Sequence, residues 1–197
     1  MEPPVFDLMA ITRMAVILAH ILAVITAGAA IAFGDYAIFG GQQINIALLH
    51  KAGSVVIVTL GMLWLTGLII IWLDTRFEWA VLIAQPKLMA KLTVVSLLSL
   101  NGIALHHLAF KRLQALQNQP MQSTKLPVIL GAISVVTWLY ATFLGLAKPV
   151  TPILGYAGFM GLYLALLAVG IATAVWLMGP RLANRLASVS DGNMQQV

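Results

Sequence analysis

Five long apolar stretches divide the chain. A membrane-spanning helix needs about 20 apolar residues to cross about 30 Å of hydrocarbon. The expected spans are residues 11–33, 46–73, 88–110, 128–147 and 153–178. Apolar and polar positions do not alternate through these stretches as they do in a membrane barrel, so we expect helices. The pattern predicts an all-α, polytopic membrane helical bundle, with residues 1–187 forming a single domain.

Turn-forming and polar residues mark the expected ends of the spans. These markers are Gly34-Asp35 after the first span, a polar loop at 117–124, Lys148-Pro149 after the fourth, Gly179-Pro180 at the end of the last helix, and a polar tail at 188–197. Residues 77–84 are apolar but too short to cross the membrane. This segment contains Trp79, a residue type typical of the interface, so we expect it to lie there.

Composition supports integral membrane insertion. Hydrophobic residues make up 61% of the chain and charged residues 9%, against about 45–50% and about 25% in soluble domains. The net charge of +5 is spread out, and no basic run is longer than Lys111-Arg112. That pattern excludes a nucleic-acid partner and suits anionic lipid headgroups. The chain has no cysteine, which excludes disulfides, iron–sulfur clusters and thiolate metal sites.

Basic residues outside the spans predict the orientation. With five spans, the N-terminus and the second and fourth connections share one side, here side A, and the remaining connections and the C-terminus lie on side B. Side A has Arg76, Lys87 and Lys148, whereas side B has Lys111, Arg112, Lys125, Arg181 and Arg185. The excess favours side B as cytoplasmic. We expect an integral protein of a bacterial inner membrane.

Polar residues inside the spans are the candidate functional residues, because each is costly to place in hydrocarbon. All six acidic residues are expected outside the spans, which argues against cation-coupled transport. The polar residues that remain in or beside the helices are Arg13, His20, His50, Lys91, Asn101, His106 and His107.

Depth sorts these residues into two groups. On side A, His20 lies about 13 Å into the first span and shares a face with Arg13 two turns away, while Lys91 enters the third span from the same side. On side B, His50 lies near His106 or His107. These two adjacent histidines diverge by about 100° around a helix, so we expect one of them to face inward.

Metal or haem ligation is the chemistry that suits these sets. Imidazole is a common axial ligand of haem iron, and helical bundles hold cofactors between facing helices. Arg13 or Lys91 would neutralise the propionates, and His50 with His106 or His107 offers a bis-histidine alternative. A structural interpretation stays open beside this one. In it His20 and Asn101 form interhelical hydrogen bonds, Lys91 reaches toward the headgroups, and glycines such as Gly61 and Gly67 permit close helix packing.

Several short segments resemble the HemJ-type protoporphyrinogen IX oxidases and the related CopD-type copper-resistance membrane proteins. They are residues 20–26 followed by Gly28, residues 59–73, Ala90-Lys91-Leu92 before His106-His107, and Lys148-Pro149. The resemblance covers about residues 14–149. It implies haem b bound through His20 as the iron ligand, Lys91 as a catalytic residue, a porphyrin substrate and electrons passed to quinone. Two family features differ, since Lys125-Leu126 precedes Pro127 instead of Asn-Glu, and residues 34–36 replace a basic stretch.

Three functions therefore stay open. The first is a haem-b membrane redox protein, which as an enzyme would be a haem-dependent membrane oxidoreductase. The second is a copper-handling protein, for which methionines would add soft ligands. The third is a non-catalytic accessory subunit of a larger membrane complex or of a homo-oligomer.

Overall fold

The computed structural model describes residues 7–40, 45–109 and 125–194, and the elements in these ranges are helices. They are α1 (Leu8–Phe39), α2 (Ile46–Thr75), α3 (Trp79–Ile83), α4 (Pro86–Ala104), the π-helix η1 (Leu105–Ala109), α6 (Lys125–Leu146), the 3-10 helix η2 (Lys148–Val150) and α7 (Thr151–Met194). Five helical segments are long and apolar enough to cross a membrane. The predicted all-α membrane bundle is confirmed. The predicted loop at 117–124, with Lys111 and Arg112, lies outside the described residues.

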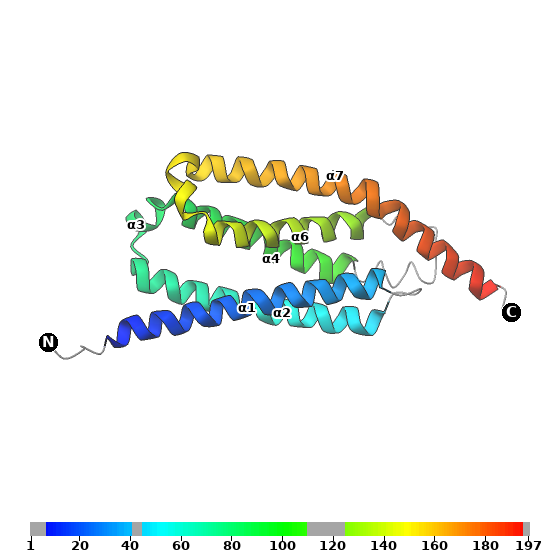
Figure 1. Ribbon diagram of the computed structural model, residues 1–197, viewed down its shortest axis with the longest axis horizontal. Helices are drawn as coiled ribbons and strands as arrows, with labels where there is room; N and C mark the ends of the chain where they lie inside the picture. The colour runs from blue at the N-terminus through cyan, green and yellow to red at the C-terminus, as the bar shows by residue number, and fades with distance from the viewer. Residues whose placement is uncertain (1–6, 41–44, 110–124, 195–197) are drawn as a thin grey trace.

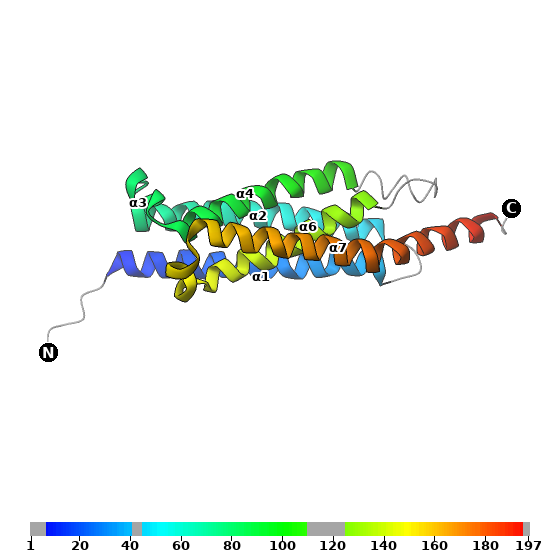
Figure 2. The same cartoon turned by 90° about the horizontal axis from the view of Figure 1, so that it is seen from above.

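The five long helices form two groups (Figures 1 and 2). α1 and α2 pack against each other as an antiparallel pair, and α4, α6 and α7 form the second group. Buried side chains within the second group are Ala90, Val94, Tyr140, Leu144, Ala147, Phe159 and Tyr163. A smaller buried cluster joins the two groups, made of Ala23, Ala27, Leu63, Leu98 and Trp138. The bundle is therefore closed at mid-height by a layer of small and aromatic side chains.

Polar side chains reinforce the packing inside the second group. Nδ2 of Asn101 on α4 donates to the Leu130 carbonyl on α6 at 3.1 Å, and the hydroxyls of Thr137 and Tyr163 lie 3.0 Å apart between α6 and α7. Helix association in lipid depends on close packing and on such bonds, each contributing about 0.6 kcal/mol on average. The interhelical role predicted for Asn101 is confirmed.

The end of α1 differs from the prediction. Gly34-Asp35 does not close the first span, because α1 continues to Phe39. α2 packs alongside here, and a β-carbon at Gly34 would lie 3.8 Å from the Ala52 side chain and 4.0 Å from that of Leu49. This packing favours continued helix over a turn. Asp35 therefore lies inside the apolar segment Leu8–Ile38, and the expectation that every acidic residue lies outside the spans was wrong.

The end of α7 also differs. Gly179-Pro180 does not stop the helix, which runs to Met194 through most of the predicted polar tail and projects beyond the other helices (Figure 1). A proline inside a helix removes one backbone hydrogen bond and bends the helix more often than it ends it. The backbone break lies instead near the start of α7, at Gly155, whose φ of 56° falls in the left-handed region.

The predicted interfacial segment contains only the five-residue helix α3. Two consecutive residues before it, Arg76 and Phe77, have positive φ values of 52° and 58° and turn the chain out of α2. Trp79 and Ile83 are exposed on α3. Its position at the membrane interface stays a prediction.

Candidate functional site

The His20 side chain lies against α2 on the side-A half of the bundle. Its Nδ1 is 2.8 Å from the hydroxyl of Thr66, and the same hydroxyl donates to the Met62 carbonyl at 2.7 Å. A threonine hydroxyl carries one hydrogen. In the tautomer that carries its hydrogen on Nδ1, His20 donates to the Thr66 oxygen while the Thr66 hydroxyl donates to Met62. That tautomer leaves the Nε2 lone pair for another partner, as in metal-ligating histidines.

Two further residues surround the His20 ring. A β-carbon at Gly67 of α2 would lie 3.8 Å from Cε1 of His20, an ordinary van der Waals distance, so the His20 ring lies directly against this part of α2. Lys91 on α4 is half-buried and lies close enough to His20 to act on it electrostatically. Within the part of the chain that the structure describes, no carboxylate forms an ion pair with Lys91. This charge is suited to an anionic group brought in by a ligand.

Arg13 does not join this group. Its Nε and Nη2 donate to the two carboxylate oxygens of Asp74 at 3.0 and 3.3 Å, tying the start of α1 to the end of α2. Asp74, which was expected outside the spans, lies inside the apolar helical segment Ile46–Thr75. An arginine already held by two hydrogen bonds is a poor partner for a propionate.

The side-B histidines come together at the far end of the bundle. The ring centroids of His50 and His106 are 6.4 Å apart, and those of His106 and His107 are 5.4 Å apart. His106 is half-buried and His107 is exposed, in line with the expectation that one of them faces inward. Both lie in the π-helix η1, a distortion that often occurs at functional sites.

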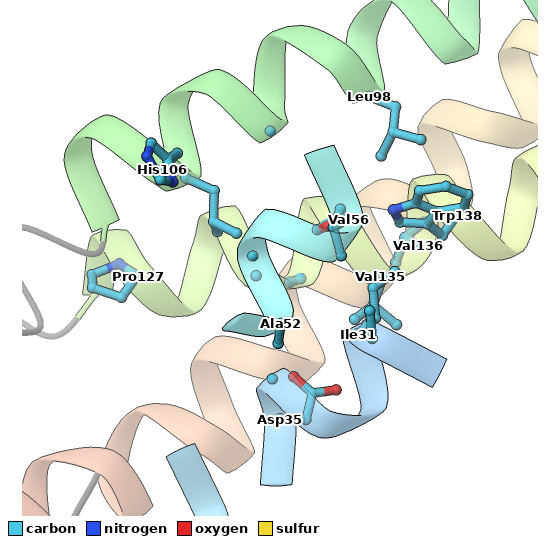
Figure 3. Close-up of a pocket in the computed structure, with 18 of the residues that line it drawn as sticks. Ile31, Asp35, Ala52, Val56, Leu98, His106, Pro127, Val135, Val136 and Trp138 are labelled. Carbon is cyan, nitrogen blue, oxygen red and sulfur yellow. The ribbon is translucent and has the colours of Figure 1, made fainter. Parts of the chain in front are cut away.

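A cleft of about 870 Å³ lies between the two helix groups next to these histidines. The five long helices and η1 contribute to its walls, which are largely apolar (Figure 3). Trp138 lies at the end of the cleft away from Pro127, and His106 and Asp35 stand on different walls (Figure 3). The cleft is therefore on side B of the layer that closes the bundle, whereas His20 is on side A.

Sequence reasoning missed both the cleft and the role of Asp35 in its wall. Gly61 was expected to permit close helix packing, yet no atom lies within 4 Å of a β-carbon built there, and it lines the cleft instead. A glycine at a packing contact and a glycine facing a cavity look the same in one sequence.

For metal ions, the donor set of the described residues is limited. Among residues 7–40, 45–109 and 125–194, no group of three or more His, Cys, Asp or Glu side chains could hold a metal ion. A metal at the side-B histidines would have to use the pair His50 and His106 together with other donors.

Comparison with known proteins identifies no relative. No protein-family model matches the chain, and neither a curated protein nor a solved structure matches it significantly. The resemblance to HemJ-type and CopD-type proteins stays a prediction that rests on the short segments quoted above.

Proposed function

We propose that this chain is an integral membrane protein that binds haem b through His20 and acts in electron transfer. The observation that carries the proposal is the hydrogen bond from Nδ1 of His20 to Thr66. With Nδ1 as the donor, Thr66 is the outer partner that iron-ligating imidazoles use, and Nε2 is left unprotonated to bind iron.

The surrounding residues fit a haem group. Gly67 lets the imidazole ring lie against α2, and Lys91 offers a half-buried cation, with no ion pair to any described carboxylate, for a propionate. Haem bound here would supply a one-electron carrier. The chain's own part is to hold the imidazole in one tautomer, to place a positive charge beside the carboxylates and to keep water away. If the protein is an enzyme, Lys91 binds the carboxylate of a porphyrin substrate and the electrons pass to quinone. The protein would then act in a bacterial inner membrane.

A reduced-minus-oxidised absorption spectrum of the detergent-purified protein, with a pyridine haemochrome assay, tests the proposal. We expect b-type bands at one haem per chain in the wild type and their loss in His20→Ala. His107→Ala is the matched control, because this exposed histidine lies at the opposite end of the bundle, and we expect it to retain haem. If His20→Ala kept full haem occupancy and His50→Ala or His106→Ala lost it, the haem would be assigned to the side-B pair of histidines.

Copper handling is the second candidate, and one observation favours it. His50 and His106 come from different helices and bring their ring centroids within 6.4 Å, a separation that allows both imidazoles to bind one ion. Bound copper without haem in the purified protein, lost in His50→Ala, would support this function. A colourless, metal-free protein that copurifies with other membrane proteins would instead favour the accessory subunit.

A further inference from the structure

The cleft on side B has the size and walls of a ligand site. Its volume of about 870 Å³ falls within the range of about 300–1,000 Å³ found for small-molecule pockets. α1 and α2 form one wall, and α4, α6 and α7 form the other. Helix groups in lipid gain from close contact, so an open space between them calls for an explanation.

Glycines on three different helices keep the cleft wide. Gly61 of α2, Gly102 of α4 and Gly131 of α6 all line it, and no heavy atom lies within 4 Å of a β-carbon built at any of them. Gly34 and Gly170 also line the cleft, but added β-carbons there would meet side chains of a neighbouring helix. The first three are therefore not needed for helix packing, and side chains at those positions would occupy the cleft.

One charged group at neutral pH stands in this apolar wall. Asp35 is exposed and lines the cleft one turn before the end of α1. Two other carboxylates have partners: Asp74 pairs with Arg13, and Asp7 caps α1. Within the described part of the chain, Asp35 forms no ion pair or hydrogen bond. A carboxylate on a spanning helix is costly unless a cation or a donor meets it.

We propose that the cleft binds an amphipathic organic cation, with its charged group at Asp35 and its apolar body extending toward Trp138. The charge of Asp35 selects a cation, because an anionic ligand such as haem would be repelled and a neutral lipid would leave the carboxylate unmatched. The volume and apolar walls select an organic ion over a metal ion. Trp138 and Trp64 add indole rings to the walls, which suit the apolar body of the ligand. This site is separate from the haem site and does not depend on it.

Equilibrium dialysis of the purified full-length protein with radiolabelled tetraphenylphosphonium tests the charge. We expect saturable binding at one ion per chain. Asp35→Asn should weaken it by about 10- to 100-fold, which is the effect of losing a charge-assisted contact, and Asp35→Glu should retain most of it. Asp7→Asn is the control, because asparagine caps a helix as well as aspartate does and this residue lies at the other end of α1.

Filling the cleft tests the position of the apolar body. Gly131→Leu and Gly102→Leu should reduce binding, since both place a side chain in open space within the cleft. Gly28→Leu is the matched control: its β-carbon also meets nothing within 4 Å, but Gly28 is outside the cleft. Retained helicity by circular dichroism and a single elution peak would show that the variants fold.

Two results would overturn the proposal. In one, tetraphenylphosphonium binds equally well to the wild type and to Asp35→Asn. In the other, a neutral quinone analogue binds with equal affinity to both proteins and displaces the cation, which would assign the cleft to a neutral amphiphile. Neither result would affect the His20 proposal, because haem occupancy is measured separately by absorption.

Discussion

Replacing Thr66 with valine tests whether the His20 hydrogen bond serves ligation. Valine keeps the shape of threonine but removes the hydroxyl that accepts Nδ1–H at 2.8 Å. The Thr66 side chain is 8% exposed, so no water would replace the lost acceptor. The Met62 carbonyl, which receives the hydroxyl hydrogen at 2.7 Å, still accepts the backbone N–H of residue 66 in the helix. The change therefore falls mainly on His20.

The expected size of the effect separates two roles for His20. A hydrogen bond between membrane helices contributes about 0.6 kcal/mol on average and about 1.7 kcal/mol at most. Loss of the outer partner of a metal-binding histidine weakens metal binding by about 10- to 100-fold, which corresponds to about 1.4–2.8 kcal/mol. If His20 ligates iron, haem affinity should fall by the larger factor, because the imidazole is then free to adopt the tautomer that protonates Nε2.

Haem titration of the apo-protein, followed by Soret absorption, measures this affinity. Thr66→Ser retains the hydroxyl and should bind haem nearly as well as the wild type, whereas Thr66→Val should bind it about 10- to 100-fold more weakly. If both variants matched the wild type while the wild type bound one haem, the hydrogen bond would have no part in ligation. The reasoning from the His20 tautomer would then be refuted, and haem occupancy of His20→Ala would decide separately whether His20 binds the iron.

Two further predictions concern stability. Gly170→Ala would bring a β-carbon into Cγ2 of Val136, a stiff β-branched neighbour. We therefore expect a loss of about 1–3 kcal/mol in the free energy of unfolding and a lower thermal midpoint by intrinsic fluorescence, with Gly28→Ala unchanged as the control. The Arg13 and Asp74 side chains are 51% and 40% exposed, so a double-mutant cycle should give a coupling free energy of no more than about 1 kcal/mol. Arg13→Gln should keep full haem occupancy. A large loss of haem in this variant would show that Arg13 takes part in haem binding.

The sequence specifies the helices well and their ends poorly. Apolar length alone predicts all five spans, because a spanning segment must satisfy its backbone internally. The predicted helix ends are wrong where a local turn signal competes with packing against a neighbouring helix. Gly34-Asp35 resembles a turn, yet Gly34 lies against Ala52 of α2 and the helix continues. Gly179-Pro180 similarly resembles a stop, but one missing backbone bond does not end α7.

The candidate sites differ in how far a sequence can reveal them. His20 and Lys91 stand out as rare polar residues in apolar helices, and their shared depth follows from helical rise. The hydrogen bond to Thr66 cannot be predicted in this way, because it depends on the register of α1 against α2. The cleft is harder still to predict from the sequence, because it arises only when Gly61, Gly102 and Gly131 of three helices face the same space.

The two candidate sites carry opposite charges at opposite ends of the bundle. His20 and Asp35 are separated by 15 positions in one helix, or about 22 Å along its axis. Between them α1 contributes Ala23 and Ala27 to the buried layer that also contains Trp138. That layer lies between Lys91 and Asp35 along the bundle. We therefore expect two separate ligands, an anionic one on side A and a cationic one on side B, because one ligand would not reach both charges.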